Sequence, residues 1–487
     1  MLFHSIDFII FFPVVVLVYF VLPDKVKNYW LLIASYYFYM NWNAKYALLL
    51  LGTSLITYMA AFLVDRWRGK SLCRLVFVLA LIAVFAILAY FKYMNFALQS
   101  LQAVLALCGV QLYVPVFDIV LPVGISFFTF QAAGYLIDVY RGETEVEKNL
   151  FRYLLFVSFF PQLVAGPIER SKNLLRQMHH VEKFEIHRVQ RGLLIMLWGY
   201  FLKLVIADRC ATFVDLVFEY YWGHGSAVLF IGAILFSLQI YCDFMGYSTI
   251  ARGAALVLGY ELMDNFRQPY FATSIQDFWR RWHISLSTWF KDYVYIPLGG
   301  NRCSKVRHFF NLMVTFLTSG LWHGADWTFV IWGGLHGVLQ ILGIITKPIV
   351  QFLHRVFRIR EDAMSYHIFC VLRTDFLAVM AWIFFRAVDL EQAVDYIRQM
   401  FTGGIRLYEL ADGTLYGFGV SEFHFNILLI GLGILFVFSF LRERRVAVLS
   451  WLGEQNVLFR YVIYWILVLL IALSFSLNNQ EFIYFQF

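Results

Sequence analysis

Long apolar segments with almost no charge recur along the whole chain. They cover residues 8–22, 75–91, 193–207, 227–242, 325–346, 425–441 and 457–477. A helix that crosses the hydrocarbon core of a bilayer needs about 20 apolar residues, whereas a membrane barrel strand needs only about 10 and alternates in polarity. These segments do not alternate. The pattern therefore predicts an all-α, polytopic membrane protein whose helices satisfy their own backbone polar groups.

The composition supports this interpretation. Of 487 residues, 61% are hydrophobic and 15% are charged, whereas an average soluble domain is about 25% charged. A water-soluble globule could not cover that much apolar surface, which excludes a cytosolic enzyme, a secreted domain and a disordered chain. No shift in composition marks a soluble region, so we expect one membrane-embedded domain over residues 1–487. The N-terminus lacks a basic segment before its apolar run, which predicts a retained first helix.

The basic residues predict the orientation of the helices. The net charge is +7, and Lys and Arg cluster between the apolar segments, as they do in cytoplasmic loops of membrane proteins. The clusters at 66–74, 302–307 and 442–445 are expected in the cytoplasm, and the loop over 389–424 on the extracytoplasmic side. No basic segment with interleaved aromatic residues suggests a nucleic-acid site, so no nucleic acid is expected. Six scattered cysteines without a Cys-x-x-Cys pair argue against a disulfide framework or a zinc site.

One predicted span is too short for a bilayer. From Phe309 to Trp322 there are 14 residues, which make about 21 Å of helix, whereas the hydrocarbon core is about 30 Å thick. The turn over 320–327 is therefore expected inside the membrane. Irregular backbone at that depth is tolerated only in a protein-lined or wet cavity. The short span thus predicts a buried cavity that contains His323.

The segment over 274–293 is predicted to be an amphipathic helix at the cytoplasmic interface. Ser274 and Asp277 form a capping-box-like start. An apolar face then recurs at helical spacing, through Phe278, Trp282, Leu286, Trp289 and Tyr293. Basic residues interrupt this face. A structural aromatic belt helix, whose basic side chains reach toward the interface, explains the same pattern.

His283, His323 and Asp243 are ionisable residues that lie inside apolar sequence. Such groups are costly in membrane segments and usually functional, and a neutral imidazole can act as a base near neutral pH. A hydrogen-bonded core histidine is the alternative for each, and it is favoured for His283 taken alone. Asp243 is expected to have a partner, and a structural hydrogen bond explains it better than catalysis.

The C-terminal segment 478–487 is aromatic to its last residue, with the sequence Asn-Asn-Gln-Glu-Phe-Ile-Tyr-Phe-Gln-Phe. A tail after a last helix is normally polar and frayed. We therefore expect this tail to turn back into the protein. Either it anchors the chain as part of an aromatic belt, or it fills a cavity and presents the Tyr484 hydroxyl.

Seven motifs in order span about residues 120–340. They are Leu121-Pro-Val-Gly-Ile-Ser-Phe-Phe-Thr-Phe130, Phe160-Pro-Gln-Leu-Val-Ala-Gly-Pro-Ile168, Asp243-Phe-Met-Gly-Tyr-Ser248, Asn265-Phe-Arg-Gln-Pro-Tyr270, Phe278-Trp-Arg-Arg-Trp-His-Ile-Ser285, Asp292-Tyr-Val-Tyr-Ile-Pro-Leu-Gly-Gly300 and Gly320-Leu-Trp-His-Gly324. In the sequence and order of these seven motifs, the chain resembles the bacterial branch of the membrane-bound O-acyltransferases. It is most similar to the membrane subunits for alginate O-acetylation and, more distantly, for teichoic-acid D-alanyl transfer.

The resemblance implies about eleven spanning helices around a central funnel, with re-entrant segments near 121–135 and 155–168. It implies that His323 is the catalytic histidine. His283 stands where many members of the family carry Asn or Asp. The tail resembles the acceptor motif of this branch, in which the tyrosine, here Tyr484, carries the acyl group across the membrane.

The implied reaction moves an acetyl group from cytoplasmic acetyl-CoA, without a metal. Thioester transfer needs a base, stabilisation of an oxyanion and exclusion of water. His323 can be the base, and His283 can orient the donor carbonyl or stabilise its developing charge. Arg280, Arg281 and Lys291 can hold the phosphates of coenzyme A, although side chains reaching to the interface explain them equally well.

The resemblance also implies a location and partners. The protein is expected in the bacterial cytoplasmic (inner) membrane, in contact with membrane lipid. Because the chain has no serine hydrolase domain, an extracytoplasmic SGNH-type acetyltransferase or esterase-like protein is expected to receive the acetyl group. That protein would O-acetylate an exported polysaccharide, such as an alginate-like exopolysaccharide or peptidoglycan, in some systems within a secretion complex.

Three alternatives stay open at the level of sequence. D-alanyl transfer from a carrier protein to a cell-wall polymer would use similar machinery. A transporter or flippase for a lipid-linked sugar would need a wide polar path with several paired charges, and few charges lie inside the apolar segments. A scaffold of a polysaccharide secretion complex would tolerate replacement of His323.

Overall fold

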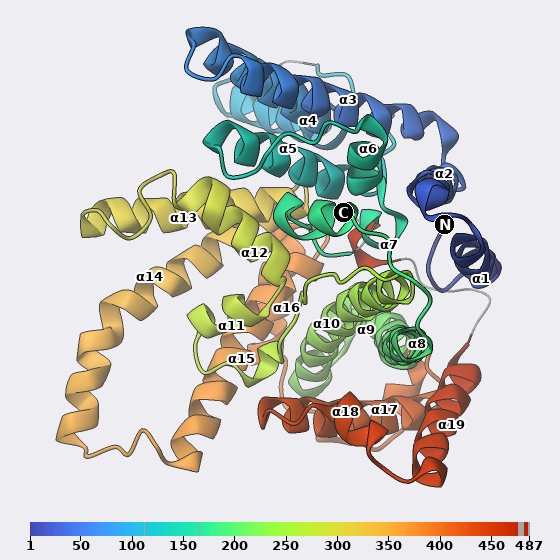
Figure 1. Cartoon of the computed structure of the whole chain (residues 1–487). Helices are drawn as coiled ribbons and strands as arrows, with labels where there is room; N and C mark the ends of the chain where they lie inside the picture. The colour runs from blue at the N-terminus through green and yellow to red at the C-terminus, as the bar shows by residue number, and fades with distance from the viewer. Residues whose placement is uncertain (112, 165, 476–481, 486–487) are drawn as a thin grey trace. The chain divides into compact units, whose positions relative to one another are not determined.

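The computed structural model describes the chain except residues 112, 165, 476–481 and 486–487. The described residues form α-helices with short 3-10 and π turns, and no strand occurs among them (Figure 1). This confirms the predicted all-α class. Contacts within the chain define two compact parts, Met1–Met196 with Tyr247–Met263, and Leu197–Gly246 with Asp264–Phe487.

The first part contains most of the N-terminal helices. They are α1 (Ile6–Val21), α2 (Asp24–Met40), α3 (Ala44–Arg66), α4 (Ser71–Leu107), α5 (Ile125–Arg141), α6 (Leu150–Ser158) and α7 (Phe160–Leu163). Helix α3 packs against α4 and α5, and α2 packs against α6. The Ser5 hydroxyl accepts a hydrogen bond from the Phe8 amide at 3.3 Å, a side-chain cap that starts α1 where the sequence predicts the first helix.

Two of the seven motifs meet inside this first part. The side-chain amide of Gln162 donates to the side-chain oxygen of Gln131 at 3.0 Å and to the Phe156 carbonyl at 2.8 Å. A Cβ at Gly124 would lie 2.6 Å from the carbonyl oxygen of Leu163, and Gly124 has φ +75°, which favours glycine. The close approach explains the glycine of the first motif, and Gln162 of the second motif bonds to Gln131, the residue directly after the first motif. Their re-entrant placement in a bilayer stays a prediction.

The second part contains the C-terminal helices. They are α9 (Asp208–Glu219), α11 (Ile275–Arg281), α12 (Ile284–Phe290), α13 (Lys305–His323), α14 (Trp327–Val356), α15 (Met364–Arg386), α16 (Leu390–Thr402), α17 (Glu422–Glu443), α18 (Val448–Gly453) and α19 (Val457–Ser474). Two helices, α8 (Ile186–Tyr200) and α10 (Ser226–Val257), contribute to both parts. A π-helical turn, η2 (Phe201–Ala207), joins α8 to α9.

Helices α13 and α14 lie side by side (Figure 1) because glycines stand at their crossing. A Cβ at Gly333 on α14 would lie 2.3 Å from the Phe316 carbonyl oxygen on α13 and 3.1 Å from the Gly320 Cα. Small residues that let two backbones approach are typical of helix packing in membranes. The close contact fixes the end of α13, where His323 lies.

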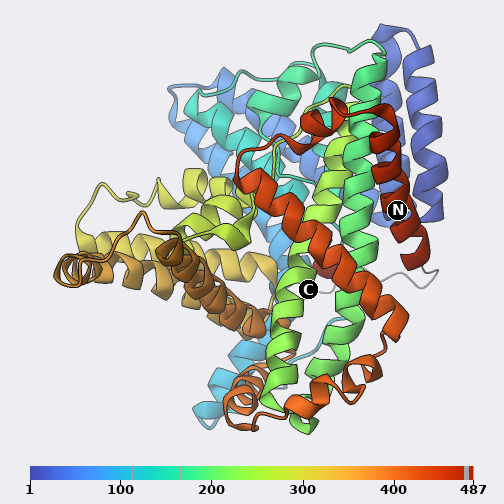
Figure 2. The same cartoon turned by 90° about the horizontal axis from the view of Figure 1, so that it is seen from below.

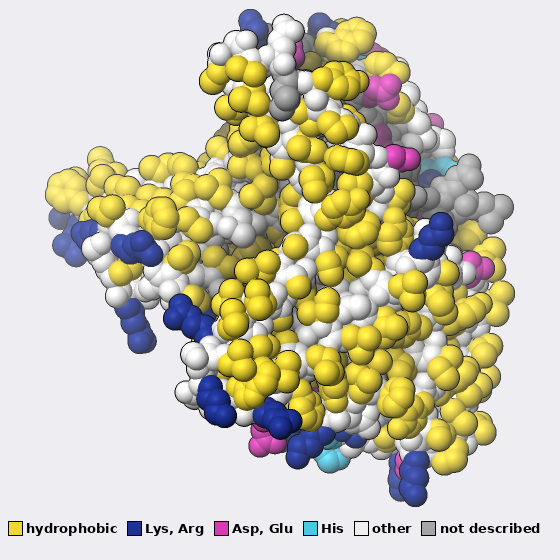
Figure 3. Space-filling view, turned by 90° about the horizontal axis from the view of Figure 1, so that it is seen from above, with side chains coloured by type: hydrophobic (Ala, Val, Ile, Leu, Met, Phe, Trp, Pro, Cys, Tyr) yellow, Lys and Arg dark blue, Asp and Glu magenta, His cyan; other side chains and the backbone are white. Residues whose placement is uncertain are grey.

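Seven helices of the described chain are long and apolar enough to cross a membrane. They are Ala44–Arg66, Ser71–Leu107, Ser226–Leu258, Trp327–Val356, Met364–Arg386, Glu422–Glu443 and Val457–Ser474. Figure 2 shows α10 as one long helix. Hydrophobic side chains cover most of the face seen in Figure 3, and Lys and Arg lie mainly toward its edges. A water-exposed surface is not covered in this way. The total of about eleven spans stays a prediction.

The predicted 14-residue span is wrong. Helix α13 has 19 residues, because Ser304 caps it through the Arg307 amide and the polar residues from Lys305 onward are helical. At 1.5 Å per residue it is about 28 Å long, so helix length no longer argues for a turn at mid-membrane. The non-helical stretch before α14 is only Gly324 to Asp326.

Candidate active site

His323 is the last residue of α13, and it is only 3% exposed. The rings of Trp332 and Phe385 enclose it, with centroids 4.9 Å and 5.5 Å from the imidazole centroid. Gly324 follows, and a Cβ there would lie 2.1 Å from an atom of the Phe329 ring. The predicted burial of His323 is therefore confirmed. Its enclosure comes from aromatic side chains of α14 and α15.

His283 lies at a break between two short helices. Helix α11 ends at Arg281 and α12 begins at Ile284, so the prediction of one continuous helix over 274–293 is wrong. The Asn265 carbonyl accepts the Ile284 amide at 2.9 Å, and its side-chain oxygen accepts the Ser285 hydroxyl at 2.6 Å. These contacts from another motif hold the break in place.

The break requires an unusual backbone conformation at His283. Its φ is +41°, a left-handed value that non-glycine residues seldom adopt and that Asn, Asp and His adopt more readily than others. These are the residue types that the resemblance implies at this position. His283 is therefore both a backbone element and a candidate for chemistry. The segment is not a surface belt, because Phe278 and Trp282 are fully buried.

The two histidines face the same aromatic cluster. Their ring centroids lie 6.5 Å apart. The ring of Phe244, on α10, lies 4.5 Å from His283 in an edge-on arrangement. The Trp322 ring lies 5.8 Å from His283. The structure thus brings together two candidate residues that are 40 positions apart in sequence.

The C-terminal tail also enters this cluster. Residues 478–481 and 486–487 of the predicted tail lie outside the described residues, but Phe482 and Ile483 are buried. The Tyr484 ring lies 5.6 Å from the His323 ring and 4.8 Å from Phe244, between centroids. The tail therefore turns back into the protein, as its aromatic sequence predicts.

The Tyr484 hydroxyl is buried in this cluster. It makes no hydrogen bond with any described residue. Burial, with a smaller contribution from Asp243, raises the pKa of this phenol well above its usual value. The hydroxyl is therefore protonated at neutral pH, and a base is needed to make it a nucleophile.

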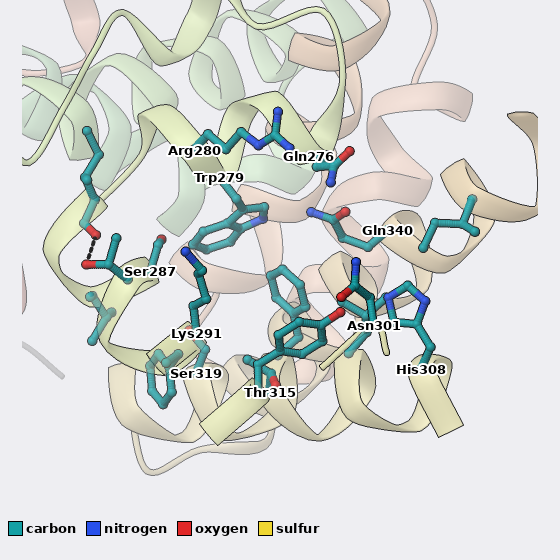
Figure 4. A pocket seen from close by; sticks show the side chains of 18 residues that line it. Gln276, Trp279, Arg280, Ser287, Lys291, Asn301, His308, Thr315, Ser319 and Gln340 are labelled. Carbon is teal, nitrogen blue, oxygen red and sulfur yellow. Dashed lines mark hydrogen bonds between the residues drawn. The ribbon is translucent and has the colours of Figure 1, made fainter. Parts of the chain in front are cut away.

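A pocket of about 550 Å³ is lined by residues of α11, α12 and α13. Arg280 and Lys291 border it, with Gln276, Gln340, Asn301 and His308 (Figure 4). Ile284, next to His283, and Ser319, one helical turn before His323, also line it. The pocket thus has a polar, basic rim, and it is lined by sequence neighbours of both histidines, although neither histidine lines it.

The family model of the membrane-bound O-acyltransferases matches residues 145–372. A probable alginate O-acetylase of Pseudomonas aeruginosa is 37% identical over 429 residues, which cover 86% of this chain and 79% of that protein. The chain belongs to the membrane-bound O-acyltransferase family.

Two further relatives share less identity with this chain. A peptidoglycan O-acetyltransferase of Helicobacter pylori is 35% identical over 80% of this chain and 77% of its own length. A teichoic acid D-alanyltransferase of Bacillus subtilis is 28% identical over 45% of this chain and 57% of its own length. As a family member with seven long apolar helices among its described residues, this chain is a multi-pass membrane O-acyltransferase.

The three basic residues predicted to bind the donor do not share one environment. Arg280 and Lys291 are exposed at the pocket rim. Arg281 is instead partly buried, with its guanidinium 3.0 Å from Asp277 and 2.7 Å from Glu443. Its two carboxylate partners give Arg281 a structural function that the sequence did not reveal.

Sequence reasoning missed a third buried histidine of this acyltransferase. His336 on α14 is fully buried, and its Nδ1 accepts a hydrogen bond from the Trp279 indole at 3.2 Å. The signal was a single His inside the apolar run over 325–346, beside glycines. Its paired ring fits a structural role, and it provides a matched control for His323.

A pH experiment tests the state of His283. Burial lowers the pKa of His283 to about 3, so its imidazole stays neutral when the pH falls from 8 to 5, a range in which an ordinary His takes up a proton at about 6.5. We expect His283→Asn, which suits the left-handed backbone, to leave the acid limb of the pH–rate profile at the wild-type position. Loss of that limb in the variant would show that His283 titrates in the reaction.

Proposed function

We propose that this protein transfers an acetyl group from cytoplasmic acetyl-CoA to Tyr484 and then to an extracytoplasmic partner that O-acetylates an exported polysaccharide. The observation that carries the proposal is the 5.6 Å separation between the Tyr484 and His323 rings inside one aromatic enclosure. The names of the relatives, an alginate O-acetylase and a peptidoglycan O-acetyltransferase, support the acceptor class.

His323 acts as the general base in the first step. It takes the proton of the Tyr484 hydroxyl, and the phenolate oxygen attacks the thioester carbon. The C–S bond breaks, the proton passes from His323 to the departing coenzyme A thiolate, and a tyrosyl acetyl ester forms. The aromatic enclosure of His323 excludes water, which would otherwise hydrolyse the thioester.

His283 supports the charge that develops on the donor carbonyl. Because its ring is neutral, one ring nitrogen carries a hydrogen that can be donated to the oxyanion. The donor carbonyl would lie between the two histidine rings, whose centroids are 6.5 Å apart. A neutral imidazole is the hydrogen-bond donor that suits this position, since an isolated imidazolium would be costly in an apolar enclosure.

The pocket of Figure 4 receives the donor. Arg280 and Lys291 would bind its phosphates at the rim, and the pantetheine arm would reach the wall near Ile284 and Ser319. The basic rim suits a phosphorylated thioester.

Replacement of the rim cations tests this assignment. We expect Arg280→Gln and Lys291→Gln each to raise the KM for acetyl-CoA about tenfold, the effect of losing one charge-assisted contact, with little change in kcat. Arg281→Gln is the matched control, because its partners are Asp277 and Glu443. It should lower thermal stability and leave the KM unchanged. An unchanged KM in both rim variants would mean that these cations serve only the interface.

The acetyl ester on Tyr484 is then passed outward. An SGNH-type protein with a serine nucleophile would take the acetyl group from the tyrosine, restore the phenol and esterify the polymer. Purified protein given either acetyl-CoA or a carrier-protein D-alanyl thioester tests the donor. Acetyl on Tyr484 supports the proposal, and D-alanyl on Tyr484 would replace it with the carrier-protein reaction.

A further inference from the structure

A buried ion cluster contacts the C-terminal tail. The Lys203 ammonium is 2.8 Å from a carboxylate oxygen of Asp208 and 2.8 Å from one of Asp243. The Lys203 side chain is only 1% exposed. Removing three charges from water is costly, so a cluster at this depth calls for a function beyond stability.

The cluster holds the tail through its backbone. The second oxygen of Asp243 accepts the Ile483 amide at 2.7 Å, in a buried hydrogen bond. At the other end of the connecting segment, the Arg209 guanidinium donates to the Ser474 carbonyl at the end of α19. Arg209 follows Asp208 directly in sequence. The tail is thus attached both where it leaves α19 and where it reaches the histidines.

The residue after Asp243 holds the aromatic side chains. The Phe244 ring lies 4.8 Å from Tyr484, 5.9 Å from Phe482 and 4.5 Å from His283, between centroids. Two consecutive residues of one motif therefore contact the tail in two ways. Asp243 binds its backbone, and Phe244 packs against the ring that carries the hydroxyl.

We propose that Asp243 is a positioning residue that receives the C-terminal tail and sets Tyr484 against His323. The Lys203 ammonium lies 2.8 Å from one carboxylate oxygen of Asp243, and the bond from the Ile483 amide to the other oxygen therefore belongs to an ion pair and is charge-assisted. The inference rests on the proposed function, in which Tyr484 is the acceptor. It assigns to Asp243 no contact with the donor.

Because of Asp208, Asp243 can be replaced without leaving Lys203 unpaired. Lys203 faces two carboxylates, so Asp243→Asn leaves it paired with Asp208 at 2.8 Å. The variant therefore avoids an isolated buried charge, which is the usual cause of unfolding when one member of an ion pair is removed.

A second variant removes only the donor of the anchoring bond. Ile483 is the first residue of a short 3-10 helix (Ile483–Phe485), a position at which proline is tolerated. Ile483→Pro deletes the amide hydrogen and leaves the ion cluster intact. Ile483→Ala is the matched control, because it removes most of the buried side chain and keeps the amide.

Hydrogen exchange in the full-length protein measures whether the tail is docked. For Asp243→Asn we expect the Ile483 amide to exchange about tenfold faster than in wild type, since a charge-assisted bond becomes a neutral one. The Tyr484 amide should exchange at least tenfold faster in Ile483→Pro than in Ile483→Ala. Wild-type exchange rates in Asp243→Asn and equal rates in the alanine and proline variants would overturn the anchor.

Single-turnover acetylation of Tyr484 then tests positioning. We expect Asp243→Asn and Ile483→Pro to slow labelling of Tyr484 by tenfold or more at saturating acetyl-CoA, with the half-saturating donor concentration unchanged. A general structural defect would alter donor binding as well. Released tails that label at the wild-type rate would overturn positioning. If wild type never labels Tyr484, the proposed function fails, and the exchange rates still decide whether Asp243 anchors the tail.

Discussion

Replacing His323 with alanine is expected to lower acetyl transfer to Tyr484 by about 10²- to 10⁴-fold, the usual contribution of a general base. The Tyr484 hydroxyl is buried and its pKa is raised, so few phenolate ions form without a base. The measurement is the single-turnover rate at saturating acetyl-CoA in detergent or nanodiscs. In cells that contain a normal amount of the His323→Ala variant, the exported polysaccharide should lack acetyl groups.

His336 provides the control for this experiment. It is the same residue type, equally buried and on the helix next to α13, but it bonds to Trp279. His336→Gln should lower thermal stability and leave the transfer rate within about tenfold of wild type, since it removes a hydrogen bond and no reacting group. If His323→Ala folds and retains more than a tenth of the wild-type rate, His323 is not the base.

Replacing Tyr484 with phenylalanine is expected to abolish acetylation of the tail and of the polymer, by at least about 10²-fold. The variant keeps the ring that packs on Phe244 and loses only the hydroxyl. Stability should not fall. The hydroxyl is buried without a hydrogen-bond partner among the described residues, and removing such a group costs nothing in lost bonds.

Tyr241→Phe is the matched control. Its hydroxyl is likewise buried and makes no hydrogen bond among the described residues, but its ring packs against Phe266 and Trp282 rather than His323. Polymer acetylation in this variant should stay near the wild-type level. Normal acetylation in Tyr484→Phe would show that the acetyl group reaches its acceptor without the tail.

The helices and the fate of the tail could be predicted from the sequence, because both follow from where apolar side chains can be placed. The apolar run over 227–242 lies within α10, and the run over 457–477 overlaps α19. An aromatic tail has no stable place in water, and Phe482 is indeed buried. The burial of His323 was also predicted, although the argument from span length was wrong because α13 starts at Lys305.

Other features depend on contacts that link distant residues. Hydrogen bonds to Asn265 hold the break at His283. The helical spacing of apolar residues over 274–293 does not predict such a contact. Asp243 was expected to have a partner, but its partner Lys203 lies 40 positions earlier in a short π-helical turn. The same holds for Arg281, whose partner Glu443 is on α17. Periodicity indicates which faces are apolar, and not which polar groups will meet.

The most direct test of the account is a search for the acetyl group on Tyr484 itself. Purified wild-type protein would be incubated with isotopically labelled acetyl-CoA and quenched within one turnover, and the C-terminal peptide analysed by mass spectrometry. If Tyr484 carries the acetyl group, one labelled acetyl ester is expected on Tyr484, and none in His323→Ala or Tyr484→Phe. A folded wild-type protein that delivers labelled acetyl to the polymer while Tyr484 stays unlabelled would contradict it.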